Sequence, residues 1–249
     1  MMNELKVLFS FGLRRRIKDS FLISYGIIMP LIMILLLGYL ASGYYTGIEG
    51  ISSYSYYTVV SLPLYTFFSS ITLIYVAREE QLFNAGSRFI VSPIHRSTLV
   101  LYKILPSTLV TFAFNLIVML ACKLLFKVNF QGQFLQVLAL LGVFGYMSCS
   151  LGTFIGLCTK NFMTVKNLVS TPLLIMGFLG GSFFPIGSLG KGFLIASYFS
   201  PLTYVNQGLF KLLYDHNNLF YIFALCITLF LGIIFTVGST IKMQKEAFI

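Results

Sequence analysis

The sequence predicts an all-α membrane protein with six transmembrane helices. Of its 249 residues, 57% are hydrophobic and only 10% are charged, whereas soluble domains carry about 25% charged residues. The charged residues also divide the chain into six largely apolar windows, each with room for the roughly 20 residues that cross a bilayer as a helix. A charge at the centre of a span costs about 2.5–3.5 kcal/mol on the insertion scale, so we assign one span to each window.

The six windows follow one another with polar segments between them. They lie between Asp19 and Glu49, Glu49 and Arg78, Lys103 and Lys123, Lys127 and Lys160, Lys166 and Lys191, and Asp215 and Lys242. The third window is short, but Lys123 can extend its ammonium group to the membrane surface. The chain is therefore predicted to form a single transmembrane domain over residues 1–249.

Residues 1–19 predict an amphipathic helix on the inner membrane surface. An apolar stripe recurs at roughly helical spacing, and the charged residues fall largely off it. The stripe consists of Leu5, Leu8, Phe9, Leu13 and Ile17. The alternative is a basic tail without a defined shape. The terminus is charged for too long to be a cleavable signal peptide.

The distribution of basic residues predicts that both termini are cytoplasmic. With the N-terminus inside, only four of the 17 Lys and Arg residues fall in outer segments, namely Lys123, Lys127, Lys191 and Lys211. Basic residues collect on the cytoplasmic side of membrane proteins. This bias also explains the net charge of +10 without a nucleic-acid partner. The polar segment 78–103 is then cytoplasmic as well.

Between the last two spans, residues 183–213 predict a re-entrant hairpin of short helices on the extracellular side. The stretch is apolar but is broken by Gly192 and Pro201. Irregular backbone at membrane depth is tolerated only where protein buries it.

Two pairs of glycines predict close helix packing. Gly152 and Gly156 form one GxxxG motif, and Gly177 and Gly181 form another. Small residues at this spacing let helices approach closely in lipid. The spacing alone leaves open whether they pack within one chain or between two copies.

The sequence lacks the motifs of catalysis and of ion coupling. It has no GxxxxGK[ST] phosphate loop, no HExxH and no GxSxG. Its two histidines, His95 and His216, fall on opposite sides of the membrane, and its four cysteines show no metal-site spacing. No window contains the buried charge that proton- or ion-coupled carriers generally keep. We therefore expect no catalytic residue and no metal site, and an energy source in another protein.

Two stretches resemble motifs of a known family. Glu79 and Glu80 followed by FIVSPIHR look like an acidic, glycine-containing stretch that ends in (S/T)-P-(I/V)-x-R. The stretch from Met176 to Leu213, MGFLGGSFFPIGSLGKGFLIASYFSPLTYVNQGLFKLL, is similar to a C-terminal signature of that family. With six spans and an N-terminal surface helix, the whole chain resembles the membrane permeases of ABC-2 type ATP-binding cassette transporters. Local departures, such as Asn84-Ala85-Gly86-Ser87 where Gly-Thr is common, leave the subfamily and the substrate open.

The resemblance implies that the cytoplasmic segment 78–103 contains a coupling helix. In this family, that helix docks into a groove of a separate ATPase subunit. The residues assigned to this contact are Glu79, Glu80, Arg88, Phe89, Pro93, His95 and Arg96. The alternative is a solvated loop whose charges only orient the chain.

The resemblance also implies a substrate path bordered by the first, second and fifth spans. Its candidate lining residues are Tyr56, Phe67 and Phe184, and its outer exit is capped by a re-entrant motif of Gly180, Gly181, Pro185, Pro201 and Tyr204. Short outer loops and an apolar interior favour an amphipathic or hydrophobic cargo, such as a drug, a peptide antibiotic or a lipid-linked glycan.

The expected function is that of an exporter subunit in a bacterial cytoplasmic membrane. Its partners would be two ABC ATPase subunits that bind ATP and Mg, a second permease copy or a paralogue, and membrane lipid, with no cofactor in this chain. Two other classes remain open: a membrane immunity or binding protein, and a self-contained channel or secondary carrier.

Overall fold

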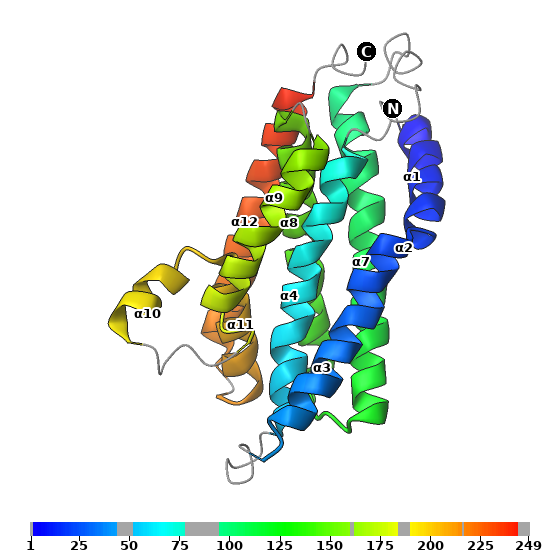
Figure 1. Cartoon of the computed structure of the whole chain (residues 1–249). Helices are drawn as coiled ribbons and strands as arrows, with labels where there is room; N and C mark the ends of the chain where they lie inside the picture. The colour runs from blue at the N-terminus through cyan, green and yellow to red at the C-terminus, as the bar shows by residue number, and fades with distance from the viewer. Residues whose placement is uncertain are drawn as a thin grey trace.

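The computed structural model describes residues 2–43, 52–77, 95–159, 162–183, 190–215 and 217–243. Within these ranges every regular element is a helix, and the long helices run side by side in one bundle (Figure 1). This confirms the predicted all-α class. We call the end of the bundle drawn at the top of Figure 1, which holds α1 and the last turn of α12, the upper end.

Five stretches among the described residues are long and apolar enough to cross a membrane. They are Ser20–Leu40, α4 (Ser53–Val76), α7 (Arg96–Leu125), α8 (Phe134–Cys158) and α12 (Asn218–Lys242). The first is built from α2 (Ser20–Ile23), the π-helix η1 (Ser24–Ile28) and α3 (Met29–Leu40). These five match the first four predicted spans and the last one.

The helix in the remaining window is shorter. It is α9 (Phe162–Leu179), in which Leu168–Leu179 is a shorter apolar stretch among the described residues. The rest of the described chain forms α1 (Met2–Ile17), α10 (Lys191–Ser197) and α11 (Pro201–Leu213). A sixth crossing through α9 stays a prediction. In Figure 1, α10 stands away from the bundle.

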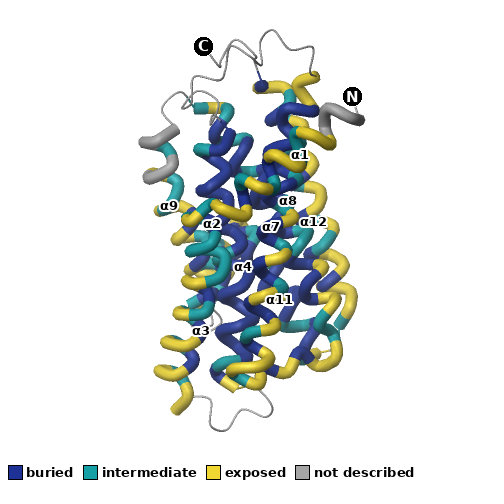
Figure 2. The backbone as a smooth tube through the Cα atoms, turned by 90° about the vertical axis from the view of Figure 1, so that its right-hand side faces the viewer, coloured by how far each residue is buried: buried dark blue, intermediate teal, exposed yellow. Residues whose placement is uncertain are grey.

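Helix α4 forms the centre of the bundle. It packs against α3, α7, α8, α9 and α11, and 83% of its apolar window is buried, against 17% for α12. Figure 2 shows the same contrast between the buried centre and the exposed outer faces. Because α4 is shielded from lipid, it can carry many hydroxyl groups. Two of these bond to backbone carbonyls of their own helix, Thr58 to Tyr54 O at 2.7 Å and Ser69 to Thr66 O at 2.6 Å.

A buried polar pair joins α4 to α7 in the middle of the bundle. The Asn115 amide donates to Thr66 Oγ1 at 2.9 Å, and both residues are buried. Such interhelical hydrogen bonds stabilise helix packing in membranes.

The glycine pair Gly152 and Gly156 packs α8 tightly against α4. A Cβ atom on Gly152 would overlap the carbonyl oxygen of Ser70, and one on Gly156 would overlap that of Ile74. In the second motif, Gly177 lies against Leu64 of α4. Both motifs therefore make contacts within one chain, which settles a point that the sequence left open.

Helix α7 begins earlier than the sequence predicted. It starts at Arg96, so residues 96–103 of the predicted coupling segment form its first two turns. Lys103, which was predicted to end the polar segment, lies inside the helix and is only 3% exposed. The helix thus extends two turns beyond the predicted window, and the buried ammonium group finds hydrogen-bond acceptors on α4.

Helix α1 confirms a helix near the N-terminus and packs lengthwise against the upper part of α7 (Figure 1). The contact is close at Gly12, where a Cβ would lie 3.1 Å from the Pro106 ring and 3.1 Å from Tyr102 O. Leu8 and Leu13 of the predicted stripe are half-buried, whereas Ile17 is exposed. The apolar stripe thus turns partly toward protein, and the helix's place at the membrane surface stays a prediction.

The tight contact of α8 on α4 predicts that Gly152→Ala destabilises the fold. The added methyl group would force the two helices apart, and overpacking of this kind costs about 1–3 kcal/mol. The matched control is Gly192→Ala, because nothing lies within 4 Å of its Cβ position.

Unfolding can be followed on heating with a thiol-reactive dye that reports exposure of the buried Cys122 and Cys149. The exposed Cys158 and Cys226 are replaced by serine in every variant. Equal melting of the two alanine variants would contradict the packing described above.

Candidate functional site

The described residues next to the predicted coupling segment are the last turn of α4 and the first turn of α7. His95 is the N-cap of α7 and Arg96 its first residue, and both are exposed at the upper end. Residues 78–94 lie outside the described residues, and with them Glu79, Glu80, Arg88, Phe89 and Pro93. The geometry of the site is therefore that of the two helix ends that flank this segment.

Lys103 connects these two helix ends. Its Nζ donates to Val76 O at 2.9 Å and to Ala77 O at 3.0 Å. The last carbonyl groups of a helix have no intrahelical partner, and the negative end of the helix dipole favours a cation there. An ammonium group from α7 thus caps the C-terminus of α4.

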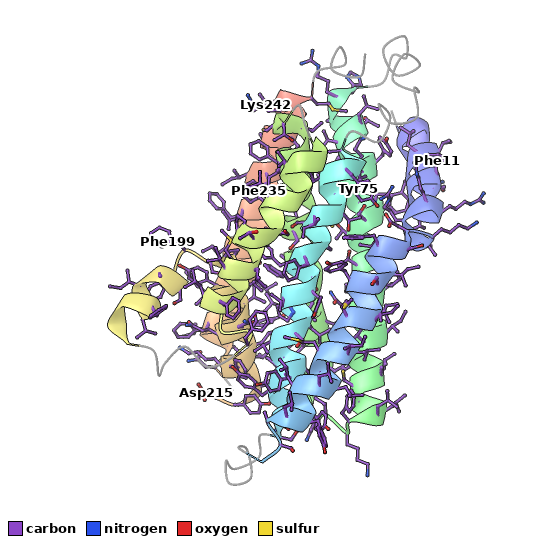
Figure 3. The ribbon with its side chains drawn as sticks, in the orientation of Figure 1. Phe11, Tyr75, Phe199, Asp215, Phe235 and Lys242 are labelled. Atoms are coloured by element: carbon purple, nitrogen blue, oxygen red, sulfur yellow. The ribbon has the colours of Figure 1, made fainter. Side chains whose placement is uncertain are left out.

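A second polar contact ties α1 and α2 to the same end of α4. The Tyr75 hydroxyl of α4 donates to the Asp19 carboxylate, which also pairs with Arg16 at 3.0 Å. The other oxygen of Asp19 accepts from the backbone N–H groups of Phe21 and Leu22 and so caps α2. Figure 3 shows Tyr75 near the upper end of α4.

Four helices therefore hold the last turns of α4 in place. Polar contacts come from α7 and from the junction of α1 with α2, and the glycine surface comes from α8. We call the four polar residues Arg16, Asp19, Tyr75 and Lys103 the α4 joint. Asp19 could have been found in the sequence as a capping residue before an apolar run. The partnership of Tyr75 and Lys103 with distant residues has no such local signal.

Away from the upper end, side chains from the start of α11 and its N-cap residue cap the end of α9 (Figure 1). Three carbonyl groups near the end of α9 accept hydrogen bonds from three residues of the S-P-L-T-Y-V-N stretch. These bonds run from Ser200 to Met176 O at 2.8 Å, from Thr203 to Leu179 O at 3.3 Å, and from Asn206 to Gly180 O at 2.7 Å. We call this set, with the carbonyls that it caps, the α9 clamp.

The predicted re-entrant motif contributes to the same clamp. Gly180 accepts the bond from Asn206, and Gly181 has a φ of +74°, a left-handed conformation that suits glycine at the end of a helix. Pro201 begins α11, and the Tyr204 hydroxyl donates to Tyr198 O at 2.9 Å just beyond α10. Pro185 lies outside the described residues.

The three predicted path residues have different surroundings. The Tyr56 hydroxyl donates to Gly181 O at 3.1 Å and so joins α4 to the α9 clamp. Phe67 is 1% exposed and stacks on Phe144 with ring centroids 5.7 Å apart, which places it in the hydrophobic core. Phe184 falls outside the part of the chain that the structure describes.

Ser200, Thr203 and Asn206 were not identified as functional residues from the sequence, although their spacing of three residues marks one face of a helix.

The match to a known protein family spans the residues of both the α4 joint and the α9 clamp. The family described as ABC-2 type transporter matches residues 3–214, from α1 to the end of α11. The chain belongs to this family. No curated protein matches it significantly.

Family membership fixes the general nature of this permease. It is a multi-pass membrane protein, and ABC-2 permease domains are transmembrane subunits that lack an ATPase domain. Such permeases bind no cofactor themselves and generally pair with ABC ATPase subunits.

The α4 joint predicts that Asp19→Ala destabilises the permease. The change removes the cap of α2, worth about 1 kcal/mol, together with the ion pair of the buried Arg16 and the acceptor of Tyr75. We expect a total loss of at least about 2–3 kcal/mol, since a single hydrogen bond to a charged group already contributes about 1.5–3 kcal/mol. Dye-monitored melting of the variant is compared with that of Lys18→Ala, a change at the exposed neighbouring residue. If the two variants melt alike, Asp19 does not hold the joint together.

The α9 clamp predicts a similar effect for Asn206→Leu. The leucine side chain cannot donate to Gly180 O, and leaving a buried carbonyl without its partner costs about 1–3 kcal/mol. Gln207→Leu is the control, because Gln207 is the exposed neighbour on the same helix. Lower melting of the Asn206 variant alone supports the clamp, and equal melting refutes it.

Proposed function

We propose that the chain is the permease subunit of an ATP-driven exporter that moves an amphipathic or hydrophobic cargo across a bacterial cytoplasmic membrane. The observation that carries this proposal is the match to the ABC-2 family over residues 3–214, which includes both helix ends around the coupling segment. The cargo would be a drug, a peptide antibiotic or a lipid-linked glycan.

The upper end of the bundle is assigned to the cytoplasm. Among the described residues, it carries the basic side chains of α1, Arg96 and Lys242, whereas Lys123, Lys127 and Lys211 lie toward the other end. The excess of basic residues at the upper end follows the positive-inside rule. On this assignment both termini and segment 78–94 are cytoplasmic.

Two ATPase subunits would dock on the coupling segments of two permease copies. The contact residues proposed are Glu79, Glu80, Arg88, Phe89, Pro93, His95 and Arg96. Binding of ATP and Mg to the ATPases would draw the coupling segments together and shift the spans between inward- and outward-open states. This is a two-state equilibrium that is biased by a ligand with higher affinity for one state.

The cargo would move along a face bordered by α3, α4 and α9. Helix α4 packs against both of the others, and a half-buried aromatic cluster lies between it and η1. The Tyr25 ring lies 6.4 Å from Tyr65 and 6.1 Å from Phe68. Aromatic rings with hydroxyl groups suit a cargo that has both apolar and polar parts. Tyr56 and Phe184 remain proposed lining residues, whereas the core position of Phe67 does not support a lining role in this conformation.

A second permease, either another copy or a paralogue, would complete the transporter. Helices α3 and α9 flank α4 and expose large apolar side chains that such a partner or lipid would cover. These side chains include Ile32, Leu35, Leu36, Leu174, Ile175 and Phe178.

The proposal predicts that an ABC ATPase co-purifies with the permease in detergent. The ATPase gene nearest to the permease gene is expressed together with it, and the amount retained per permease is measured. Because Glu80 and Pro93 lie in the coupling segment, Glu80→Ala and Pro93→Ala should each reduce retention by about tenfold, equivalent to the loss of about 1.4 kcal/mol of binding free energy.

Lys123→Ala serves as the control, because Lys123 lies near the opposite end of α7. Retention that is unchanged in all three variants would contradict the assigned docking segment. Solute movement by the permease alone in liposomes would instead indicate a channel or a secondary carrier. Specific binding of a bacteriocin without any ATPase would indicate an immunity protein.

A further inference from the structure

We propose that Lys103 is a positioning residue that ties the two stems of the coupling segment together, so that a displacement of this segment moves α4 and α7 as one unit. The stems are the end of α4 at Val76 and Ala77 and the first two turns of α7. The joint movement of α4 and α7 rests on the proposed function, because it needs an ATPase to displace the coupling segment. The bond between the two stems does not, because it lies within the permease itself.

The position of Lys103 along α7 suits such a connection. It lies seven residues after Arg96, which is about two helical turns or about 10 Å along the helix axis. Its ammonium group nevertheless bonds to the last carbonyls of α4, at 2.9 and 3.0 Å. The end of α4 thus lies beside α7 near Lys103, about two turns into that helix, and is fastened to it there.

The environment of Lys103 favours a persistent contact. The residue is 3% exposed, and a buried ammonium group is costly unless it is hydrogen-bonded. Its two carbonyl acceptors lie at a helix C-terminus, where the helix dipole favours positive charge. The Tyr102 ring adds a cation–π contact, with its centroid 5.4 Å from Nζ. The Tyr102 ring belongs to α7 as well, so separating the stems would strip the cation of its two carbonyl acceptors on α4.

Packing alone does not require a cation at this position. The neighbouring side chains Leu99, Val100 and Ile104 form an apolar cluster with Leu73 and Val76 of α4. A methionine at position 103 would fill similar space in that cluster. The feature that only a cationic donor adds is a bond to the backbone of the last turn of α4.

The rest of the α4 joint does not replace this connection. Tyr75 and Asp19 link α4 to the junction of α1 with α2, and Gly152 packs α8 on α4. Among the described contacts between α4 and α7, the Asn115–Thr66 pair lies deeper in the bundle. Lys103 is therefore a polar contact between the two stems themselves.

The first experiment uses the full-length permease in lipid nanodiscs without any ATPase. Hydrogen exchange is measured on peptides that cover residues 70–77 and 96–103 in Lys103→Met, Lys103→Arg and the control Lys123→Met. Loss of the cap should let the end of α4 fray. We expect exchange in residues 70–77 to be at least about tenfold faster in Lys103→Met and no more than about threefold faster in Lys103→Arg, which corresponds to about 1.4 kcal/mol for the tenfold change.

Which of the two Lys103 variants exchanges faster in residues 70–77 shows whether Lys103 caps α4 or only fills space. If Lys103 only filled space, methionine would be the better substitute, and the larger arginine would cause the greater loss of protection. That order, or an exchange rate of Lys103→Met equal to wild type, would overturn the proposal. Lys123→Met should exchange like wild type, because Lys123 is exposed on the same helix.

The second experiment uses the complex with the ATPase that co-purifies. Hydrogen exchange at the lower end of α4, residues 53–62, is compared before and after trapping the complex with ATP and vanadate. Lys103→Met should retain the ATPase like wild type but lose most of the nucleotide-dependent change. A full change in this variant would overturn the mechanical role. If the wild type retains no ATPase, the proposed function fails, while the nanodisc result still decides whether Lys103 ties the stems.

Discussion

A helix that ends where water is scarce leaves carbonyl groups without a hydrogen-bond partner, and each such group costs free energy until another group donates to it. Two helices of this permease end in this way, and the two candidate sites are the means by which their carbonyls are satisfied. At the end of α4 the donor is the ammonium group of Lys103. At the end of α9 the donors are Ser200, Thr203 and Asn206. In each case the donor comes from a distant part of the chain, so capping a helix also joins two elements.

Helix α4 takes part in both arrangements. Its upper end carries Tyr75 and the carbonyl groups that Lys103 caps, and its lower part carries Tyr56, which donates to Gly181 O beyond α9. Between these points most of α4 is buried, with Asn115 of α7 bonded to its Thr66 and with Gly152 and Gly156 of α8 packed against it. A closely packed helix that is fixed at both ends moves as a rigid element. It is therefore suited to carry a displacement from one side of the membrane to the other.

The central position of α4 also explains the distribution of polar residues among the spans. Its mean hydropathy of 1.7 is lower than the 2.4 of the first span and the 2.6 of α12, although 83% of its apolar window is buried, against 22% and 17% in those two. Lipid, and not the protein interior, is the most apolar surrounding in this molecule. The most apolar helices therefore lie on the outside, and the helix that is richest in Ser and Thr lies at the centre.

The sequence by itself determined the class of the protein, most of its spans and its family. These follow from local composition, because a charge inside a span is costly wherever the chain goes next, and from motifs that are contiguous in the chain. The stretch from Met176 to Leu213 was recognised as a family motif in this way, whereas the contacts that Ser200, Thr203 and Asn206 make with the end of α9 were not. Only the tertiary structure decided that Lys103 is buried within α7, that Phe67 belongs to the core and that Gly152 packs against the same chain. Each of these depends on a contact with a helix distant in sequence, and local composition and spacing carry no information about which helix that will be.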